Sequence, residues 1–181
     1  IGYGLAAMLL LGTLYGFIAT AQPLYGQAYG LGDHFALAMA GTAIVQSIAA
    51  FACSRLIPRF GSQAVGMTGL ATYVGFAAVA LVMLHLDALP FSLLLLIITA
   101  MMTMFTWADA TLGALSMANL GKIAGTAASA FGAIQQLGAT LLGSIIGQCY
   151  DGTPRALLWG SFLLGAIALA SAFWAGKSQR Q

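Results

Sequence analysis

The chain is a succession of six long apolar stretches separated by short polar connections. A helix that crosses a membrane needs about 20 predominantly apolar residues. We therefore predict membrane-spanning helices at about residues 2–26, 35–56, 64–86, 89–118, 123–150 and 156–175. The stretches are too long and too continuously apolar for the strands of a membrane barrel, which alternate. The predicted fold is an all-α polytopic bundle of six transmembrane helices that forms one domain over residues 1–181.

The composition also indicates a membrane environment. Of the 181 residues, 61% are hydrophobic and 6% are charged, and the mean hydropathy is +0.95. A soluble domain carries about 25% charged residues, so the lipid bilayer must be the main solvent of this chain. The net charge of +2 is too small to indicate a nucleic-acid partner. Because the chain begins at Ile1 and its first stretch is too long for a signal peptide, we expect a fragment or a processed chain.

The charged residues between the predicted helices divide unequally between the two sides of the membrane. Short connections make consecutive helices antiparallel, so alternate connections fall on the same side. One side receives five cations: Arg55, Arg59, Lys122, Lys177 and Arg180. The other side receives one cation and three acids: Arg155, Asp33, Asp87 and Asp151. Since cytoplasmic connections carry the excess of Lys and Arg, we predict that both termini are cytoplasmic.

Amides and a carboxyl group lie inside four of the six stretches, whereas stretches 64–86 and 156–175 contain only hydroxyl and aromatic polar groups. Small and polar residues accompany each of them at the spacing of one helix face. Two interpretations are open. The amides can bridge helices, and small residues such as Gly12 with Gly16, or Gly143 with Gly147, let helices pack closely. Alternatively, the four faces line a water-filled path. We favour this interpretation because a role in bridging helices would not explain why the amides and the carboxyl group are absent from two stretches. The candidate lining residues are Gln22, Gln46, Thr106, Asp109 and Gln136. Gln135 points about 100° away from Gln136 on a helix, so only one of the two is expected to face the path.

Asp109 is the most informative residue for function, because it is a carboxyl group inside a predicted span. An ionised carboxylate at the centre of a bilayer costs about 2.5–3.5 kcal/mol, so Asp109 must face protein or water. It is either a structural carboxyl group bonded to a neighbouring helix or a site of proton or cation coupling. Met102 shares its face and could touch a ligand. Apart from Arg55 at the end of the second stretch, no Lys or Arg lies inside a predicted span, which favours a neutral or cationic, partly apolar cargo.

The arrangement of four path-lining and two peripheral helices resembles one half of a twelve-helix transporter of the major facilitator superfamily. Arg59-x-Gly61 is similar to the degenerate second copy of that superfamily's cytoplasmic loop motif, although Pro58 stands where the motif has an acid. The segment 124–132, which begins Ala-Gly-Thr-Ala-Ala-Ser-Ala, resembles a helix start in the bicyclomycin/chloramphenicol-resistance type of drug:proton antiporter. The turn Asp151-Gly152-Thr153-Pro154 also resembles that branch. The branch often has Pro-Asn where this chain has Ala110-Thr111, which leaves the substrate open.

The resemblance covers the whole chain as the C-terminal six helices of such a transporter. It implies proton-driven export of small drug-like or metabolite molecules by alternating access in a bacterial inner membrane. The partner would be the missing N-terminal six-helix half or an equivalent unit. Arg55, Arg59 and Gly61 would form the cytoplasmic gate loop. The assignment of coupling to Asp109 comes from the cost of the buried charge and not from the resemblance.

Other classes of function are weighed against this one. A transport-inactive six-helix structural subunit of a larger membrane complex is the main alternative. A channel is less favoured because no charged rings or backbone filters appear. The sequence shows no nucleotide-binding loop and no spacing of metal ligands, so we expect neither an enzyme nor a bound metal or cofactor. His34 and His85 are expected at the membrane edge, and Cys53 and Cys149 at opposite ends of their helices, too far apart for a disulfide.

Overall fold

The computed structural model describes residues 2–29, 35–86, 88–117 and 124–178. Within these residues every regular element is a helix, and six helices are long and apolar enough to cross a membrane. The helices are α1 (Gly2–Gln22), η1 (Pro23–Ala28), α2 (Phe35–Phe60), α3 (Ser62–His85), α4 (Phe91–Met117), α5 (Ala124–Gln148) and α6 (Arg155–Ser178). The predicted all-α membrane fold is confirmed. His34, Asp33, Asp87, Lys122 and Arg180 lie outside the described residues.

Two prolines affect the helices differently. At Pro23 the first span changes from an α-helix to the wider π-helix η1, as expected where a missing N–H removes one helical hydrogen bond. Pro58, in contrast, lies inside α2, which continues to Phe60. Sequence reasoning ended this helix at residue 56 and was wrong by one turn. A proline so close to the end removes only one hydrogen bond, and the last turn is closed by the N–H of Gly61 bonded to the carbonyl of Ile57 at 2.8 Å.

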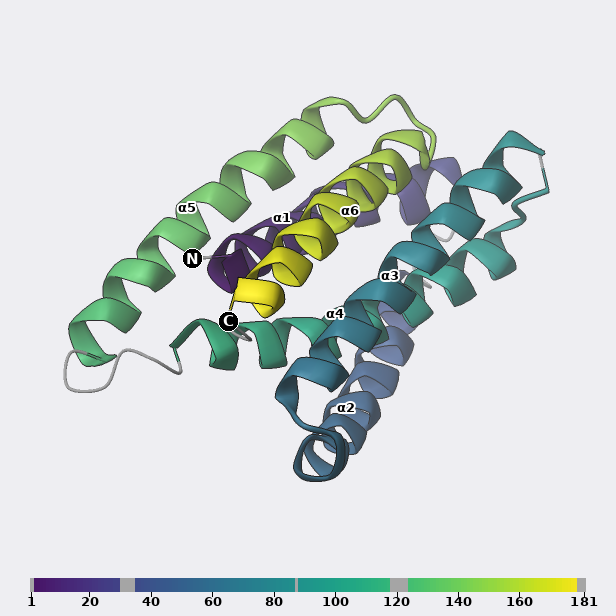
Figure 1. Cartoon of the computed structure of the whole chain (residues 1–181). Coiled ribbons are helices and arrows are strands. Elements are labelled where there is room, and N and C mark those ends of the chain that lie inside the picture. Colours follow the sequence, from purple (N-terminus) through teal and green to yellow (C-terminus); the bar gives the residue numbers. More distant parts are fainter. Residues whose placement is uncertain (1, 30–34, 87, 118–123, 179–181) are drawn as a thin grey trace.

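Four helices form the core of the bundle, and two are attached to its sides. Helix α1 packs on α4, α4 on α3, α3 on α6 and α6 on α1, so these four close a ring. Helix α2 packs mainly on α4, and α5 mainly on α1. Consequently α2 and α5 stand at opposite edges of the bundle (Figure 1). Helix α1 is the most buried span, and α2 and α5 are the least buried.

The core inside this ring is almost entirely apolar. Its fully buried side chains include Leu10, Tyr73, Leu94, Met102 and Leu112. Met102 is 1% exposed, so the expectation that it could touch a ligand is wrong. Met102 and Asp109 share a helix face by periodicity. A neighbouring helix covers Met102, however, whereas Asp109 is partly exposed.

Glycines allow α1 and α5 to lie side by side at very short distance. A Cβ atom at Gly143 would lie 2.9 Å from the backbone nitrogen of Gly16, so any larger residue would push the helices apart. A Cβ at Gly12 would meet the Leu142 side chain at 2.9 Å. The two GxxxG pairs therefore serve close helix packing, which was one of the two interpretations of the small residues.

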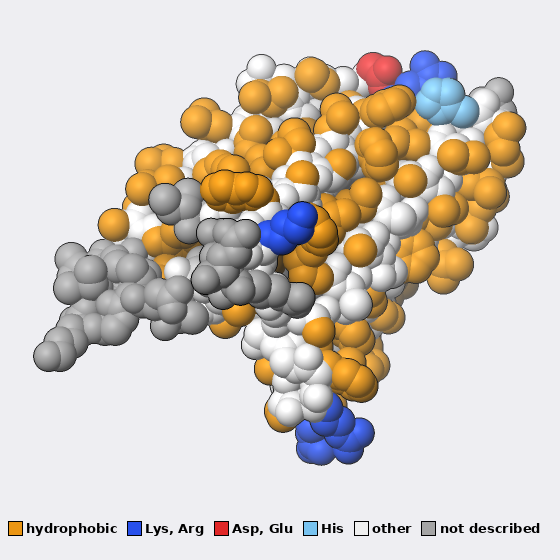
Figure 2. All heavy atoms as spheres, viewed as in Figure 1, with side chains coloured by type: hydrophobic (Ala, Val, Ile, Leu, Met, Phe, Trp, Pro, Cys, Tyr) orange, Lys and Arg blue, Asp and Glu red, His pale blue; other side chains and the backbone are white. Residues whose placement is uncertain are grey.

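The outer surface of the bundle is covered by large apolar side chains. Leu37, Ile48, Leu141, Ile167 and Trp174 are each more than half exposed. In Figure 2 hydrophobic side chains cover much of the visible face, and few charged groups are seen. Such a surface matches a lipid environment, since apolar groups exposed to water on this scale are unfavourable.

Candidate transport site

The polar residues inside the spans lie at different depths. Eight residues, or about 12 Å of helix, separate Asp109 from Met117 at the end of α4. The midpoint of α4 is five residues, or about 7.5 Å, from Asp109. Asp109 therefore lies closer to the middle of the span than to its end, on the side of the end that also carries Arg55, Arg59 and Lys177, which we call the cationic end. Gln46 and Gln136 lie near the middle of α2 and α5, whereas Gln22 is the last residue of α1 at the opposite end.

Asp109 is partly exposed on the surface of α4. Within the described residues, no hydrogen bond or ion pair reaches its carboxylate. The interpretation that Asp109 is a structural carboxyl group bonded to a neighbouring helix therefore finds no partner among these residues. A carboxyl group inside a span is expected to face protein or water, and the described residues supply no protein partner for it.

The contact between α2 and α4 includes one pair of hydroxyl groups and one hydrogen bond from an indole N–H. The Thr42 and Thr99 hydroxyl oxygens lie 3.3 Å apart. The Trp107 indole N–H donates to the carbonyl of Ala49 at 2.8 Å. Gln46 shares the helix face of Thr42 and Ala49 and is partly exposed at the edge of this contact.

Thr106 lies one turn from Asp109 on the same face of α4. Its hydroxyl group donates to the backbone carbonyl of Met102 at 2.9 Å, a common arrangement for threonine in helices. The side chain is only partly buried, and the hydroxyl oxygen retains a free lone pair for a second partner.

Gln136 is the only predicted path residue whose side chain bonds to another helix in the described part of the chain. Its amide group donates to the hydroxyl oxygen of Tyr15 on α1, although both side chains stay accessible. The neighbouring Gln135 is partly buried. Gln22 is exposed at the end of α1.

The five predicted path residues thus belong to α1, α2, α4 and α5 and are at least partly exposed, and no groove found among the described residues gathers them. Four surface grooves of the described part are lined by other residues, chiefly from α3 and α6. A second body would be needed to enclose these residues in a path.

The residues predicted to form a gate loop are placed differently from expectation. Arg55 and Arg59 both lie on the last turns of α2, and Gly61 alone separates α2 from α3. Gly61 has a φ angle of 82°, a conformation that L-residues with a side chain rarely adopt. The Arg55 guanidinium carbon lies 4.9 Å from the centre of the Phe51 ring. The prediction of a loop carrying both arginines is therefore wrong, because the helix persists through Pro58.

At the end of the bundle opposite the cationic end, Asp151 orders the turn before α6. Its carboxylate accepts hydrogen bonds from the Thr153 hydroxyl at 2.6 Å and from the Thr153 N–H at 3.0 Å. These bonds to Thr153 lower the pKa of Asp151. On the last turn of α3, His85 is exposed, and its Nδ1 lies 2.9 Å from the Leu81 carbonyl oxygen. The expectation that His85 lies at the membrane edge therefore agrees with its position at a helix end.

Sequence reasoning missed Trp107 and Lys177. Trp107 connects α4 to α2, and Lys177 lines a groove between α3 and α6. Neither residue type carries a signal for such a role, because a Trp in a span and a Lys at its end are both common.

The two cysteines are free, with Cys53 buried and Cys149 exposed. The described residues contain no group of three or more His, Cys, Asp or Glu side chains that could hold a metal ion.

Comparisons with known protein families, with curated proteins and with solved structures find no match to this chain.

Proposed function

We propose that this chain is one half of a proton-coupled secondary transporter in a bacterial inner membrane. In this proposal it pairs with a second six-helix unit and exports small, neutral or cationic, partly apolar molecules by alternating access. Both termini would face the cytoplasm, as the distribution of Lys and Arg indicates. The observation that carries the proposal is Asp109.

Asp109 is a carboxyl group inside a span with no protein partner among the described residues and with part of its surface open. Leaving it against lipid would cost about 2.5–3.5 kcal/mol at the centre of the membrane and less nearer the headgroups. A purely structural role would be expected to supply a hydrogen-bonding partner. The open carboxyl group is better explained by a water-filled path, where it can take up and release a proton.

The arrangement of α2 and α5 supports the existence of a second unit. Both helices are little buried, and each exposes a stripe of small or weakly polar side chains. On α2 the stripe is Ala36, Ala43, Ser47, Ala50 and Ser54, and on α5 it is Ala133, Gln136, Thr140 and Ser144. Stripes of this kind let helices pack closely in membranes. A partner resting on both would cover these stripes and enclose a space for Gln46, Asp109 and Gln136 to line.

Alternating access would then follow from rocking of the two units about a site between them. Gln46, Thr106 and Gln136 would offer hydrogen bonds to the cargo, and Gln22 would lie at the outer mouth. Asp109 would hold a proton in one state and release it to the cytoplasm in the other, because a carboxyl group is cheaper to dehydrate when neutral. Gly61 would act as a hinge beside Arg55 and Arg59. The Lys and Arg side chains of the described residues lie only in the end turns of the helices and not in the middle of the spans, which is why anionic cargo is not favoured.

The test is transport by the full-length protein in proteoliposomes with an imposed pH gradient. Asp109→Asn keeps the size of the side chain but cannot release a proton. We expect it to reduce gradient-driven transport at least tenfold while downhill exchange of cargo and the folded yield are retained. Asp151→Asn is the matched control, because Asp151 is an exposed carboxyl group outside the spans, and it should transport normally.

Equal gradient-driven transport by Asp109→Asn and wild type across a pH series would remove Asp109 from the mechanism. A well-folded wild-type protein that moves none of a panel of neutral and cationic compounds would instead support the alternative of a structural subunit.

A further inference from the structure

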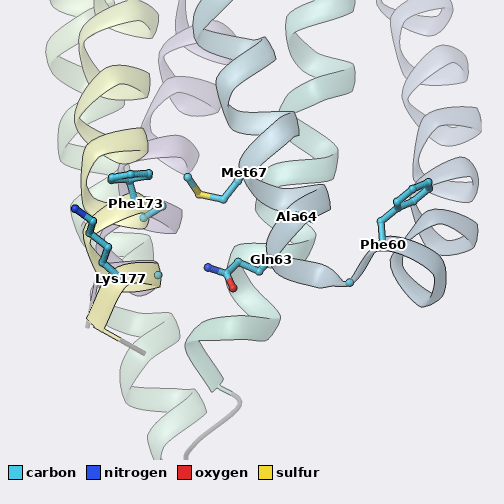
Figure 3. Close-up of a pocket in the computed structure, with 9 residues that line it drawn as sticks. Phe60, Gln63, Ala64, Met67, Phe173 and Lys177 are labelled. Atoms are coloured by element: carbon cyan, nitrogen blue, oxygen red, sulfur yellow. The ribbon is translucent and has the colours of Figure 1, made fainter. Parts of the chain in front are cut away.

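A groove lies between α3 and α6, and none of the predicted path residues lines it. It occupies about 650 Å³ at the cationic end of the bundle. Figure 3 shows it between the first turns of α3 and the last turns of α6, with the Lys177 and Gln63 side chains near its lower end. Its lining residues are Phe60, Gly61, Gln63, Ala64, Met67, Ala172, Phe173, Gly176 and Lys177.

The groove has a polar end and an apolar wall. Lys177 brings a positive charge, with its Nζ 5.7 Å from the centre of the Phe173 ring. Gln63 lies opposite on α3, and its amide nitrogen comes so close to Gly176 that a Cβ there would be only 2.5 Å away. Above them, Met67 and Phe173 point towards one another in Figure 3. No lining residue is acidic, so the charge of Lys177 is not neutralised within the groove.

The position of the groove along the helices matters as much as its chemistry. Lys177 is in the last turn of α6 and Gln63 in the first turn of α3, the depth at which a membrane places lipid headgroups. Towards the interior, both helices present exposed apolar side chains such as Val79 and Ile167. The N-cap residue of α3 is Gly61, which makes no side-chain cap, so the helix end adds positive polarity to the same place.

We propose that this groove binds an anionic phospholipid, with the headgroup phosphate at Lys177 and Gln63 and an acyl chain along Met67 and Phe173. A basic pocket between membrane helices at the interface is the setting in which acidic headgroups are recognised. Free phosphate would use the polar end but not the apolar wall. A single uncompensated cation at headgroup depth suits a lipid phosphate better than a protein segment.

The test is lipid binding by the purified protein, followed by native mass spectrometry during titration with phosphatidylglycerol, and with phosphatidylcholine as the zwitterionic reference. Lys177→Gln should weaken phosphatidylglycerol binding about fivefold and leave phosphatidylcholine binding unchanged. Arg55→Gln is the matched control, since it removes the same charge from the same end outside the groove, and it should change binding less than twofold.

A second pair of variants tests the apolar wall without changing charge. Ala64→Trp fills the groove from an exposed position of α3, and Ala71→Trp makes the same change two turns further along, outside the lining residues. We expect the first to reduce binding of both lipids and the second to reduce neither. Both positions are exposed, so both variants should fold.

Three results would overturn the proposal. The first is equal loss of phosphatidylglycerol binding in Lys177→Gln and Arg55→Gln, which would mean general attraction to the charged end. The second is unchanged lipid binding in both Lys177→Gln and Ala64→Trp. The third is complete displacement of the lipid by glycerol 3-phosphate at equal concentration, which would identify a site for a free phosphate compound.

Discussion

Two intramembrane polar residues, Asp109 and Gln136, meet different surroundings although both come from similar polar stripes in the sequence. Gln136 finds the Tyr15 hydroxyl on α1, whereas Asp109 finds no partner within the described residues. An amide that bridges two helices is explained by packing alone. Packing alone does not explain a carboxyl group without a partner, because placing such a group in a membrane span without a hydrogen bond is unfavourable. The functional interpretation is therefore stronger for Asp109 than for Gln136.

The bond between Gln136 and Tyr15 can be measured with a double-mutant cycle of Tyr15→Phe and Gln136→Leu. We expect a coupling energy of about 0.6 kcal/mol in the free energy of unfolding, the average for hydrogen bonds between membrane helices. Gln135→Leu is the control, since Gln135 makes no such bond to Tyr15, and its coupling to Tyr15→Phe should be close to zero. Equal coupling for both glutamines would mean that the bond adds nothing specific.

At the level of elements, helix contacts in this bundle depend on small residues and few polar bonds. The α1–α5 contact uses Gly12, Gly16 and Gly143, and the α2–α4 contact uses Trp107 with the Ala49 carbonyl. Lipid supplies no hydrophobic force between helices, so close packing has to supply the attraction. The edges α2 and α5 each depend mainly on one such contact with a core helix.

Gly143→Val should therefore separate α5 from α1 and lower the free energy of unfolding by about 1–3 kcal/mol, the usual range for overpacking. Gly132→Val is a matched control in the same helix, because a Cβ at Gly132 meets nothing within 4 Å. Thermal unfolding in detergent compares the two variants. Equal melting temperatures would show that the α1–α5 contact can widen without cost.

At the scale of the whole molecule, the ring of α1, α4, α3 and α6 leaves α2 and α5 apart at its edges (Figure 1). The proposed path residues Gln46, Asp109 and Gln136 come from α2, α4 and α5, whereas the proposed lipid-binding groove lies between α3 and α6. This division predicts different access to water on the two sides. It also separates the two proposals, because the groove can bind lipid whether or not the chain transports anything.

Thiol labelling tests that division in the full-length protein with Cys53 and Cys149 replaced. Cysteines at Gln46 and Gln136 should react with a charged maleimide at least ten times faster than cysteines at Val79 and Ile167, because the reactive thiolate forms only where water reaches it. All four positions are at least partly exposed in this chain, so burial within it cannot produce the difference. Faster labelling at Val79 and Ile167 would reverse the proposed arrangement.

The positions of the spans were predictable because hydrophobic length is a local property. The predicted stretch 35–56 begins where α2 begins, at Phe35, but stops before the helix does. Proline was taken as a boundary, and only the hydrogen bond from Gly61 to Ile57 shows that the last turn survives. Met102 shows the other limit, since periodicity gives the direction of a side chain but not which helix lies opposite it.

The sequence by itself determined that the chain is a helical membrane protein, since some 20 continuous apolar residues and almost no charge leave the backbone only one way to satisfy its hydrogen bonds in lipid. It also singled out Asp109, because a charge is costly wherever it lies in a span. Only the tertiary structure decided that α2 and α5 stand apart, that Gln136 meets Tyr15, and that Lys177 and Gln63 face one groove. Those facts depend on contacts between residues far apart in the chain, and hydropathy and helical periodicity carry no information about such contacts.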